Sequence, residues 1–168
     1  MKPDFEELVE RHSAEIFAYL WRMLRETSDA EDCFQETFLR AFRSYVRVRA
    51  GTNYRAWLYK IATNTARSQW RQKKRGDAYT IQLDPDRQAD EMSTADRVEQ
   101  KALLRAVAQA VEHLPQQQRA ALIMRKYQEL SYAEIATVLE CTEAAARAHV
   151  YQEVKRLREQ LAEVEVTV

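Results

Sequence analysis

Hydrophobic residues recur every three or four positions through most of the chain, which is the spacing of α-helices that bury one face. The first such stretch begins after Asp4, a residue type favoured just before a helix, and continues to about Arg25. It predicts a helix over residues 5–25, with inner positions at Phe5, Leu8, Val9, His12, Ile16, Tyr19, Leu20 and Met23.

A second helix is predicted from the run Ser28-Asp29-Ala30-Glu31 to about Tyr45. The run fits a capping box, in which a serine and the glutamate three positions later bond each other's free backbone N–H groups. Helical spacing gives this helix an inner stripe of Ala30, Phe34, Phe38, Ala41, Phe42 and Tyr45, and an outer one of Asp32, Gln35, Glu36, Leu39 and Arg40.

Residues 46–53 break the helical pattern and contain Gly51, so they predict a loop. A third helix is predicted over residues 54–75, and Gly76 suits the position that follows a helix C-terminus. Residues 77–97 are acidic, contain a proline and have no sustained period, which predicts a linker.

Two helical stretches follow the linker, over residues 94–113 and from Pro115 to about Tyr127. Proline suits the first turn of a helix because the backbone N–H that it lacks has no partner there. No internal repeat or low-complexity tract interrupts this half of the chain.

The C-terminal part has the spacing of a helix-turn-helix. A second capping-box match, Ser131 with Glu134, opens a short helix that ends at Leu139. Residues 140–142 form the turn, and Thr142 is expected to cap a last helix that runs to about residue 163. The inner stripe of that helix is Ala146, Val150, Val154, Leu157 and Leu161.

These elements predict an all-α fold of two small helical domains joined by a flexible acidic linker. The expected boundaries are 1–76 for the first domain, 77–97 for the linker and 98–168 for the second domain. Composition agrees, because 168 residues include only 2 glycines and 3 prolines, fewer turn formers than a β fold uses.

Cysteine and histidine positions argue against a metal site. Cys33 and Cys141 are far apart and lack the spacing of zinc ligands, so we expect no metal, no cofactor and two free thiols in a reducing cytoplasm. The acidic N-terminus does not resemble a signal peptide, and no apolar run approaches the roughly 20 residues of a membrane span.

The net charge of zero hides a strongly polarised chain. Residues 37–76 carry 11 basic and no acidic residues, whereas residues 1–36 carry 4 basic and 10 acidic residues and residues 77–97 carry 2 and 6. A concentrated basic segment of this kind is suited to a polyanion, and the phosphate backbone of nucleic acid is the commonest one. The alternative is a solvated surface whose acidic partners lie elsewhere in the fold.

One face of the third helix carries this charge. Lys60, Asn64, Arg67, Arg71 and Lys74 fall within an arc of about 80° at 100° per residue, and we call them the cationic ridge. Leu58, Ile61, Ala62 and Thr65 lie opposite. Solvated helix faces usually mix Glu with Lys, so the absence of acids favours nucleic acid over an ordinary amphipathic surface.

The loop before this helix offers groups for an unpaired base. Arg49, Thr52 and Asn53 are placed to line a pocket, and Tyr54 and Trp57 to stack on exposed bases. The alternative for both aromatic residues is a place in the core.

The helix-turn-helix offers a second DNA-reading surface, with Glu143, Arg147, Ala148 and Tyr151 facing outwards. A helical hairpin that only packs is the alternative. Glu143 and Glu153, expected near the reading face, argue against strong DNA affinity.

Two segments together resemble a known family. The run DAEDCFQETFLRAF, from Asp29 to Phe42, resembles region 2 of the extracytoplasmic-function class of bacterial sigma factors. The run WLYKIATNTAR, from Trp57 to Arg67, resembles the segment that follows it, and Leu114-Pro115 with the helix-turn-helix resembles region 4.

The resemblance implies a cytoplasmic transcription-initiation subunit without catalytic activity of its own. Its partners would be core RNA polymerase, through the β′ clamp helices and the β flap, and promoter DNA; an anti-sigma factor is left open. The polymerase surface would be Asp32, Gln35, Glu36, Leu39 and Arg40.

The resemblance also assigns DNA-binding residues. Melting and binding of the minus-ten element would fall to Arg49, Thr52, Asn53, Tyr54, Trp57, Lys60, Asn64, Arg67, Arg71 and Lys74. Recognition of the minus-thirty-five element would fall to Thr142, Glu143, Arg147, Ala148 and Tyr151.

Departures from the family pattern concern the last helix. Ala144-Ala145-Ala146 replaces a common Gly-Thr-Val, and His149 and Gln152 stand where arginine is frequent, which predicts weaker binding of this helix to DNA.

The competing interpretation of the whole chain is a helix-turn-helix regulator or polymerase-bound adaptor that does not melt DNA. An enzyme has little support, because His12, His113 and His149 are scattered without a catalytic set.

Overall fold

The computed structural model describes residues 1–77, 101–102, 105–106 and 114–166, and all regular structure within them is α-helical. The prediction of an all-α fold is confirmed. The predicted linker from residue 78 onwards and most of the helix predicted over 94–113 lie outside the described residues, apart from two helical pairs at 101–102 and 105–106.

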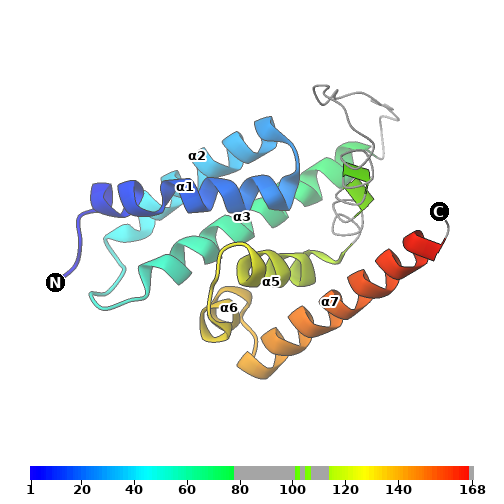
Figure 1. The fold of residues 1–168 in the computed structure, drawn as a ribbon. Helices are drawn as coiled ribbons and strands as arrows, with labels where there is room; N and C mark the ends of the chain where they lie inside the picture. Colours follow the sequence, from blue (N-terminus) through cyan, green and yellow to red (C-terminus); the bar gives the residue numbers. More distant parts are fainter. Residues whose placement is uncertain (78–100, 103–104, 107–113, 167–168) are drawn as a thin grey trace.

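The N-terminal half is a three-helix unit of α1 (Phe5–Leu24), α2 (Thr27–Tyr45) and α3 (Tyr54–Asp77), each packed against the other two (Figure 1). The C-terminal half contains α5 (Gln116–Lys126), α6 (Tyr132–Leu139) and α7 (Glu143–Val166). The two halves are in contact, because α6 packs on α3 and α5 packs on α1. Their buried residues form one continuous hydrophobic cluster.

The centre of the N-terminal half lies between α1 and α3. Ile16, Tyr19 and Leu20 of α1 and Leu58 and Tyr59 of α3 are all fully buried, at the helical spacing that the sequence predicts. The buried Tyr19 hydroxyl is paired with the Thr63 hydroxyl at 2.8 Å, so the core contains no unsatisfied phenol here.

Helix α2 begins earlier than predicted, and the expected capping box at Ser28 is absent. The helix starts at Thr27, and the Ser28 hydroxyl instead donates to Glu26 Oε1 at 3.2 Å. Asp29 serves a tertiary role, because its carboxylate accepts from Lys73 at 2.7 Å and ties the start of α2 to the end of α3. That long-range pair was not visible in the local pattern.

The buried stripe of α2 is also rotated relative to the prediction. Cys33 and Thr37 are buried, whereas Phe42 is 62% exposed and its ring lies 5.3 Å from the Phe5 ring in a T-shaped arrangement. Small side chains face α1 and α3, which lets the three helices approach closely and leaves the larger rings of Phe34 and Phe38 half-buried at the side.

Two further helix ends of the N-terminal half differ from the predicted caps. Asp4 precedes α1, yet its side chain makes no capping hydrogen bond. Helix α3 continues through Gly76 instead of ending before it. Gly51, in the loop over residues 46–53, is the glycine with the positive φ, at 81°.

The helix-turn-helix follows its predicted plan closely. The capping box at Ser131 is confirmed, with Glu134 N donating to Ser131 Oγ at 3.2 Å and Ser131 N donating to Glu134 Oε2 at 2.8 Å. The cap at Thr142 is confirmed too, because its hydroxyl accepts from Ala145 N at 3.1 Å. Pro115 lies just before α5 and not in its first turn.

One residue of α7 departs from the prediction. Glu153 was expected near the outward reading face, but its side chain is 1% exposed. It lies seven residues after Ala146 and three after Val150, so the helical period places it in the inner stripe that begins with those two buried residues. Its carboxylate has Arg156 3.5 Å away as an ion-pair partner.

Within the described residues, no helix combines the length and the apolar character that crossing a membrane requires.

Candidate nucleic-acid interface

The cationic ridge runs along the side of α3 and is exposed towards its C-terminal end. Asn64, Arg71 and Lys74 are exposed, whereas Lys60 and Arg67 are half-buried. In the part of the chain that the structure describes, neither Arg71 nor Lys74 has an ion-pair partner, and the Lys74 ammonium lies 5.3 Å from the centre of the Trp70 ring. The opposite positions Leu58, Ala62 and Thr65 are buried, as the pattern predicts.

The N-terminal end of the ridge has acidic neighbours from the C-terminal half. Lys60 Nζ lies 2.8 Å from Glu140 Oε1, at the end of α6. The hydrogen bond and charge of Lys60, together with the charge of Arg67, lower the pKa of Glu140. The acid-free segment of residues 37–76 therefore meets carboxylates that are distant in sequence, which was the alternative left open by charge counting.

Arg67 lies beside this contact with part of its guanidinium unsatisfied. Its Nη2 atom is buried and has no hydrogen-bond partner among the described residues. A buried donor without an acceptor costs about 1–3 kcal/mol, so this arginine is not explained by the stability of the isolated chain.

The loop before α3 is closed by its own hydrogen bonds. The Arg49 carbonyl accepts from the Thr52 hydroxyl at 2.9 Å and from the Tyr54 hydroxyl at 3.1 Å. Asn53 uses both ends of its amide, since Oδ1 accepts from Ala56 N at 3.0 Å and Nδ2 donates to Glu134 Oε1 at 3.1 Å. The predicted pocket residues thus lie together, and the Asn53 amide is hydrogen-bonded to Glu134 of α6.

The aromatic residues of this region form one group. The Tyr45 ring lies 6.2 Å from that of Tyr54 and 6.1 Å from that of Trp57, and the Phe5 ring lies 5.3 Å from Tyr45 on the other side. Tyr54 and Trp57 are half-buried, so each is partly packed and partly accessible from the loop. The alternative of a place in the core therefore holds in part, and stacking on exposed bases stays a prediction.

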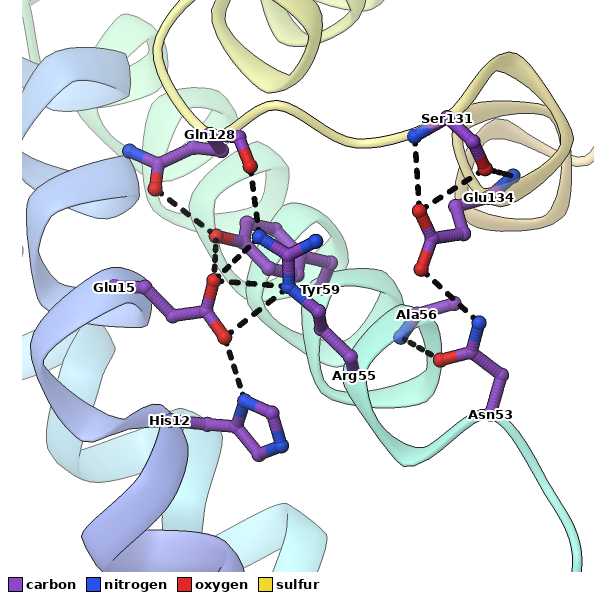
Figure 2. Close-up of polar contacts among 9 residues, drawn as sticks. All are labelled: His12, Glu15, Asn53, Arg55, Ala56, Tyr59, Gln128, Ser131 and Glu134. Carbon is purple, nitrogen blue, oxygen red and sulfur yellow. Dashed lines mark hydrogen bonds and ion pairs between the residues drawn. The ribbon is translucent and has the colours of Figure 1, made fainter.

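Sequence reasoning missed a polar network between α1, α3 and the segment after α5 (Figure 2). The Glu15 carboxylate accepts from Arg55 Nη2 at 2.8 Å and lies 2.5 Å from His12 Nδ1. Arg55 Nη2 also donates to the Gln128 carbonyl at 2.7 Å. The Tyr59 hydroxyl lies 3.1 Å from both Glu15 Oε2 and Gln128 Oε1.

The network shifts the pKa values of Glu15 and Tyr59. Burial raises the pKa of Glu15, but the hydrogen bonds from Arg55 and His12 and the charge of Arg55 outweigh it, and the pKa lies below its ordinary value of 4.5. Burial, followed by the Glu15 charge, raises the pKa of Tyr59, so its phenol stays protonated. No local motif marks the network, because all its contacts except His12–Glu15 join residues 40 or more positions apart.

The predicted polymerase surface lies on the outer side of α2. Asp32, Gln35, Leu39 and Arg40 are exposed, and Leu39 is 50% exposed despite being apolar. Glu36 is half-buried and pairs with Arg40 at 2.5 Å. An open hollow of about 380 Å³ between α2 and α3 is lined by Asp32, Cys33, Glu36, Arg40, Thr65, Ser68, Gln69 and Gln72.

The outward face of α7 brings the other predicted DNA-reading residues together. Thr142, Glu143, Arg147, Ala148 and Tyr151 are all exposed, and Tyr151 is 71% exposed. Arg147 pairs with Glu143 at 2.8 Å, and its guanidinium lies 4.6 Å from the Tyr132 ring. The arginine is thus held in place on the surface, while the Thr142 hydroxyl is engaged as a helix cap.

The described residues contain no group of three or more His, Cys, Asp or Glu arranged to hold a metal ion. Cys33 and Cys141 are free thiols. Burial and the charge of Asp29 raise the pKa of Cys33 to about 11, so this thiol is unreactive at neutral pH.

In a comparison with known protein families, each half of the chain matches one region of the sigma-70 family, and the two regions come in the family's order. Sigma-70 region 2 matches residues 8–76, and sigma-70 region 4 matches residues 104–157. The RNA polymerase sigma factor CarQ of Myxococcus xanthus is 34% identical over 164 residues, which cover 98% of this chain and 92% of CarQ.

Two further relatives agree. The ECF RNA polymerase sigma factor SigE of Mycolicibacterium smegmatis is 32% identical over 95% of this chain, which spans 62% of SigE. The crystal structure of the sigma factor RpoE from Bartonella quintana, determined with the anti-sigma factor NepR, has the same fold with a TM-score of 0.74. It is 24% identical and covers 95% of this chain and 97% of its own.

A basic helix in a three-helix unit, followed by a capped helix-turn-helix, defines the two-region class of bacterial transcription-initiation factors related to sigma-70. Within that class, the chain belongs to the extracytoplasmic-function family of RNA polymerase sigma factors. It is accordingly a promoter-recognition subunit that binds core RNA polymerase.

Proposed function

We propose that this sigma factor divides its work among three helices. The outer face of α2 docks on the β′ clamp helices of core polymerase. The cationic ridge of α3, together with the loop over residues 46–53, binds and melts the minus-ten element. Helix α7 reads the minus-thirty-five element. The chain supplies no catalytic residue and acts in the cytoplasm, where polymerase is.

The unsatisfied guanidinium of Arg67 supports this proposal best. Among the residues that the structure describes, Arg67 Nη2 is buried without an acceptor, and the ridge continues from it to the exposed Arg71 and Lys74, which have no ion-pair partner there. Three cations in an acid-free stretch of the helix are suited to successive phosphates, and a phosphate oxygen would satisfy the orphaned donor once the packing that buries it has opened.

The α7 surface supports a smaller contribution from region 4. Arg147 is the cation of this face, and Glu143 already neutralises it. Phosphate contacts here would be few, so we expect minus-thirty-five recognition to depend on polymerase holding the β flap against region 4.

An anti-sigma factor is a further proposed partner, since the similar Bartonella quintana sigma factor was crystallised with one. The partner would compete with polymerase for the exposed face of α2, around Leu39 and Arg40.

Run-off transcription tests the proposal. Core polymerase, this chain and a genomic promoter library should yield transcripts with shared upstream elements when start sites are sequenced. Activity that appears only when another sigma factor is added would instead favour a polymerase-bound adaptor that does not melt DNA.

A further inference from the structure

The segment before α1 is bonded to the end of α2 through one residue, Tyr45. The Tyr45 hydroxyl donates to the Pro3 carbonyl, and the Lys2 ammonium donates to the Tyr45 carbonyl at 2.5 Å. The same ammonium lies 4.0 Å from the centre of the Tyr45 ring. Both polar groups of Tyr45 and its ring are therefore held by residues that lie 42 and 43 positions earlier in the sequence.

A lysine suits this place for a physical reason. Tyr45 is the last residue of α2, and its carbonyl also accepts from Val48 N at 3.0 Å. Carbonyls at the end of a helix lack a partner within the helix and carry the negative end of its dipole, so a cation is stabilising there. Lys2 and Val48 together fix the point from which the loop over residues 46–53 leaves the helix.

The ring of Tyr45 contacts the residues that open α3. Its centre lies 6.2 Å from that of Tyr54 and 6.1 Å from that of Trp57, both in tilted arrangements. Tyr54 then donates through its hydroxyl to the Arg49 carbonyl at 3.1 Å, inside the loop. Rings at these separations attract one another in preferred orientations. A continuous set of contacts thus leads from the segment before α1, through Tyr45, to the loop and the first turn of α3.

The loop has little else to fix its position. None of the residues 46–53 is buried. Its backbone bond from Thr52 N to the Arg49 carbonyl is long, at 3.4 Å. Segments with few buried apolar groups move readily, so the placement of such a loop depends on its two ends. Tyr45 precedes the loop and Tyr54 follows it, and the contact between their rings joins the two ends.

We infer that Tyr45 is a positioning residue for minus-ten recognition, and that Lys2 and Pro3 hold it in place. Tyr45 sets where the Tyr54 and Trp57 rings lie, and thereby the space that a base leaving the duplex can enter. This inference rests on the proposed minus-ten role of α3 and its loop, and it names the residues that position them.

The Tyr45→Phe variant tests this role, because it removes the hydroxyl that bonds Pro3 and keeps the ring. Holoenzyme is assembled from core polymerase and the full chain on a promoter recovered from a genomic library. Permanganate reactivity of unpaired thymines should show open-complex formation slowed about 3- to 10-fold, the effect of one lost hydrogen bond. Binding to core polymerase should stay unchanged.

A template whose minus-ten element is already unpaired separates positioning from damage to the fold. On this template the base no longer has to be taken out of a duplex, so Tyr45→Phe should transcribe within about twofold of the unmodified chain. An equal loss on the duplex and the unpaired template would overturn the inference.

Tyr127→Phe is the matched control for the loss of one phenol hydroxyl. Tyr127 belongs to the C-terminal half and is 57% exposed, and its hydroxyl has no hydrogen bond among the described residues. Its effect on open-complex formation should stay below about twofold. Equal slowing in Tyr127→Phe and Tyr45→Phe would contradict a specific role of Tyr45.

Lys2→Met repeats the test without changing Tyr45. It keeps an apolar stem and removes the ammonium, so open-complex formation should slow as it does in Tyr45→Phe. Lys2→Arg should restore the rate, because a guanidinium can also donate to the carbonyl and lie over the ring. An Lys2→Arg variant as slow as Lys2→Met would count against the inference.

Amide hydrogen exchange of the full chain gives a measurement independent of DNA. Tyr45→Phe and Lys2→Met should speed exchange in peptides that cover residues 46–53 and leave the buried centres of α1 and α3 unchanged. Faster exchange throughout all three helices would show a role in stability alone. Unchanged exchange in the loop would show that Tyr45 does not position it. Either result would refute the inference.

Asn64→Ala separates failure of this inference from failure of the proposed function. Asn64 is an exposed residue of the proposed minus-ten surface and has no described contact with Tyr45. If neither Asn64→Ala nor Tyr45→Phe slows open-complex formation, the minus-ten role of α3 fails and the inference with it. If Asn64→Ala slows it and Tyr45→Phe does not, only the positioning role of Tyr45 is refuted.

Discussion

Glu15 shows how one residue can organise an interface between segments. It is a half-buried carboxylate on α1 that contacts His12, Arg55 and Tyr59. Arg55 also donates a hydrogen bond to the Gln128 carbonyl, which links the network to the C-terminal half. Removing its charge would leave the Arg55 guanidinium with a backbone acceptor but without its ion-pair partner.

The first prediction at this scale concerns acid stability. The pKa of Glu15 is lowered in the folded chain, so the unfolded chain binds protons more readily and folding is favoured above the unfolded value of about 4.5. This stabilisation is lost as pH falls through the lower, folded pKa. The thermal midpoint should therefore drop as the pH falls below about 4.5. The drop should be smaller in Glu15→Gln than in Glu10→Gln, a substitution on the exposed side of α1.

The second prediction concerns Asn64, the exposed amide of the ridge. As its proposed role is contact with a base of the melted strand, Asn64→Ala should slow open-complex formation about tenfold or more and leave core-polymerase binding unchanged. Permanganate reactivity of unpaired thymines and a separate polymerase-binding assay measure the two steps. An equal loss in both would indicate damage to the fold.

At the scale of elements, α3 combines a buried face with an unusually uniform charged one. Leu58, Tyr59 and Ala62 fix the helix in the core, so the opposite cations are held at helical spacing in a segment, residues 37–76, that has no acidic residue. Counterion release should then dominate the affinity of this helix for DNA.

Arg67→Ala plus Arg71→Ala tests that expectation. The slope of log affinity against log salt concentration should become shallower by about 1.4 to 1.8, which corresponds to two lost phosphate contacts. Fluorescence titrations from about 50 to 200 mM salt supply the slope. A substitution that weakens binding at every salt concentration by one constant factor would contradict a phosphate role.

Helix α2 gives the element-scale prediction for polymerase. Glu36→Lys reverses a charge in the exposed face and replaces the Glu36–Arg40 pair by repulsion, so core-polymerase affinity should fall about tenfold or more. Circular dichroism should remain unchanged, because exposed pairs of this kind contribute less than about 1 kcal/mol. Glu31→Lys, on the same helix but outside the proposed surface, is the control.

For the molecule as a whole, the informative feature is that the two halves share one core. The acid-free segment of residues 37–76 lies against carboxylates of the C-terminal half, and Arg119 reaches across to α1 and α3. Opening of this interface and binding of DNA use the same residues of α3. Salt weakens the internal ion pairs and the phosphate contacts alike, so it should favour opening of the interface and disfavour DNA binding.

Much of the fold follows from local signals in the sequence. The period of hydrophobic residues predicts α1, α2, α3, α5, α6 and α7, and the capping box at Ser131 and the cap at Thr142 place the ends of the helix-turn-helix. These signals are readable because a cap and a stripe involve residues only three or four positions apart.

The rotation of α2, the burial of Glu153 and the occupation of Asn53 and Lys60 were decided by tertiary packing. The Asn53–Glu134 bond joins residues 81 positions apart, and no local pattern specifies which of several exposed acids will meet a given cation. The sequence by itself determined the helices, the family and the charged ridge, because each depends on residue type and short spacing. Only the tertiary structure decided that the ridge begins beneath α6, because that depends on how two separately patterned halves fit together.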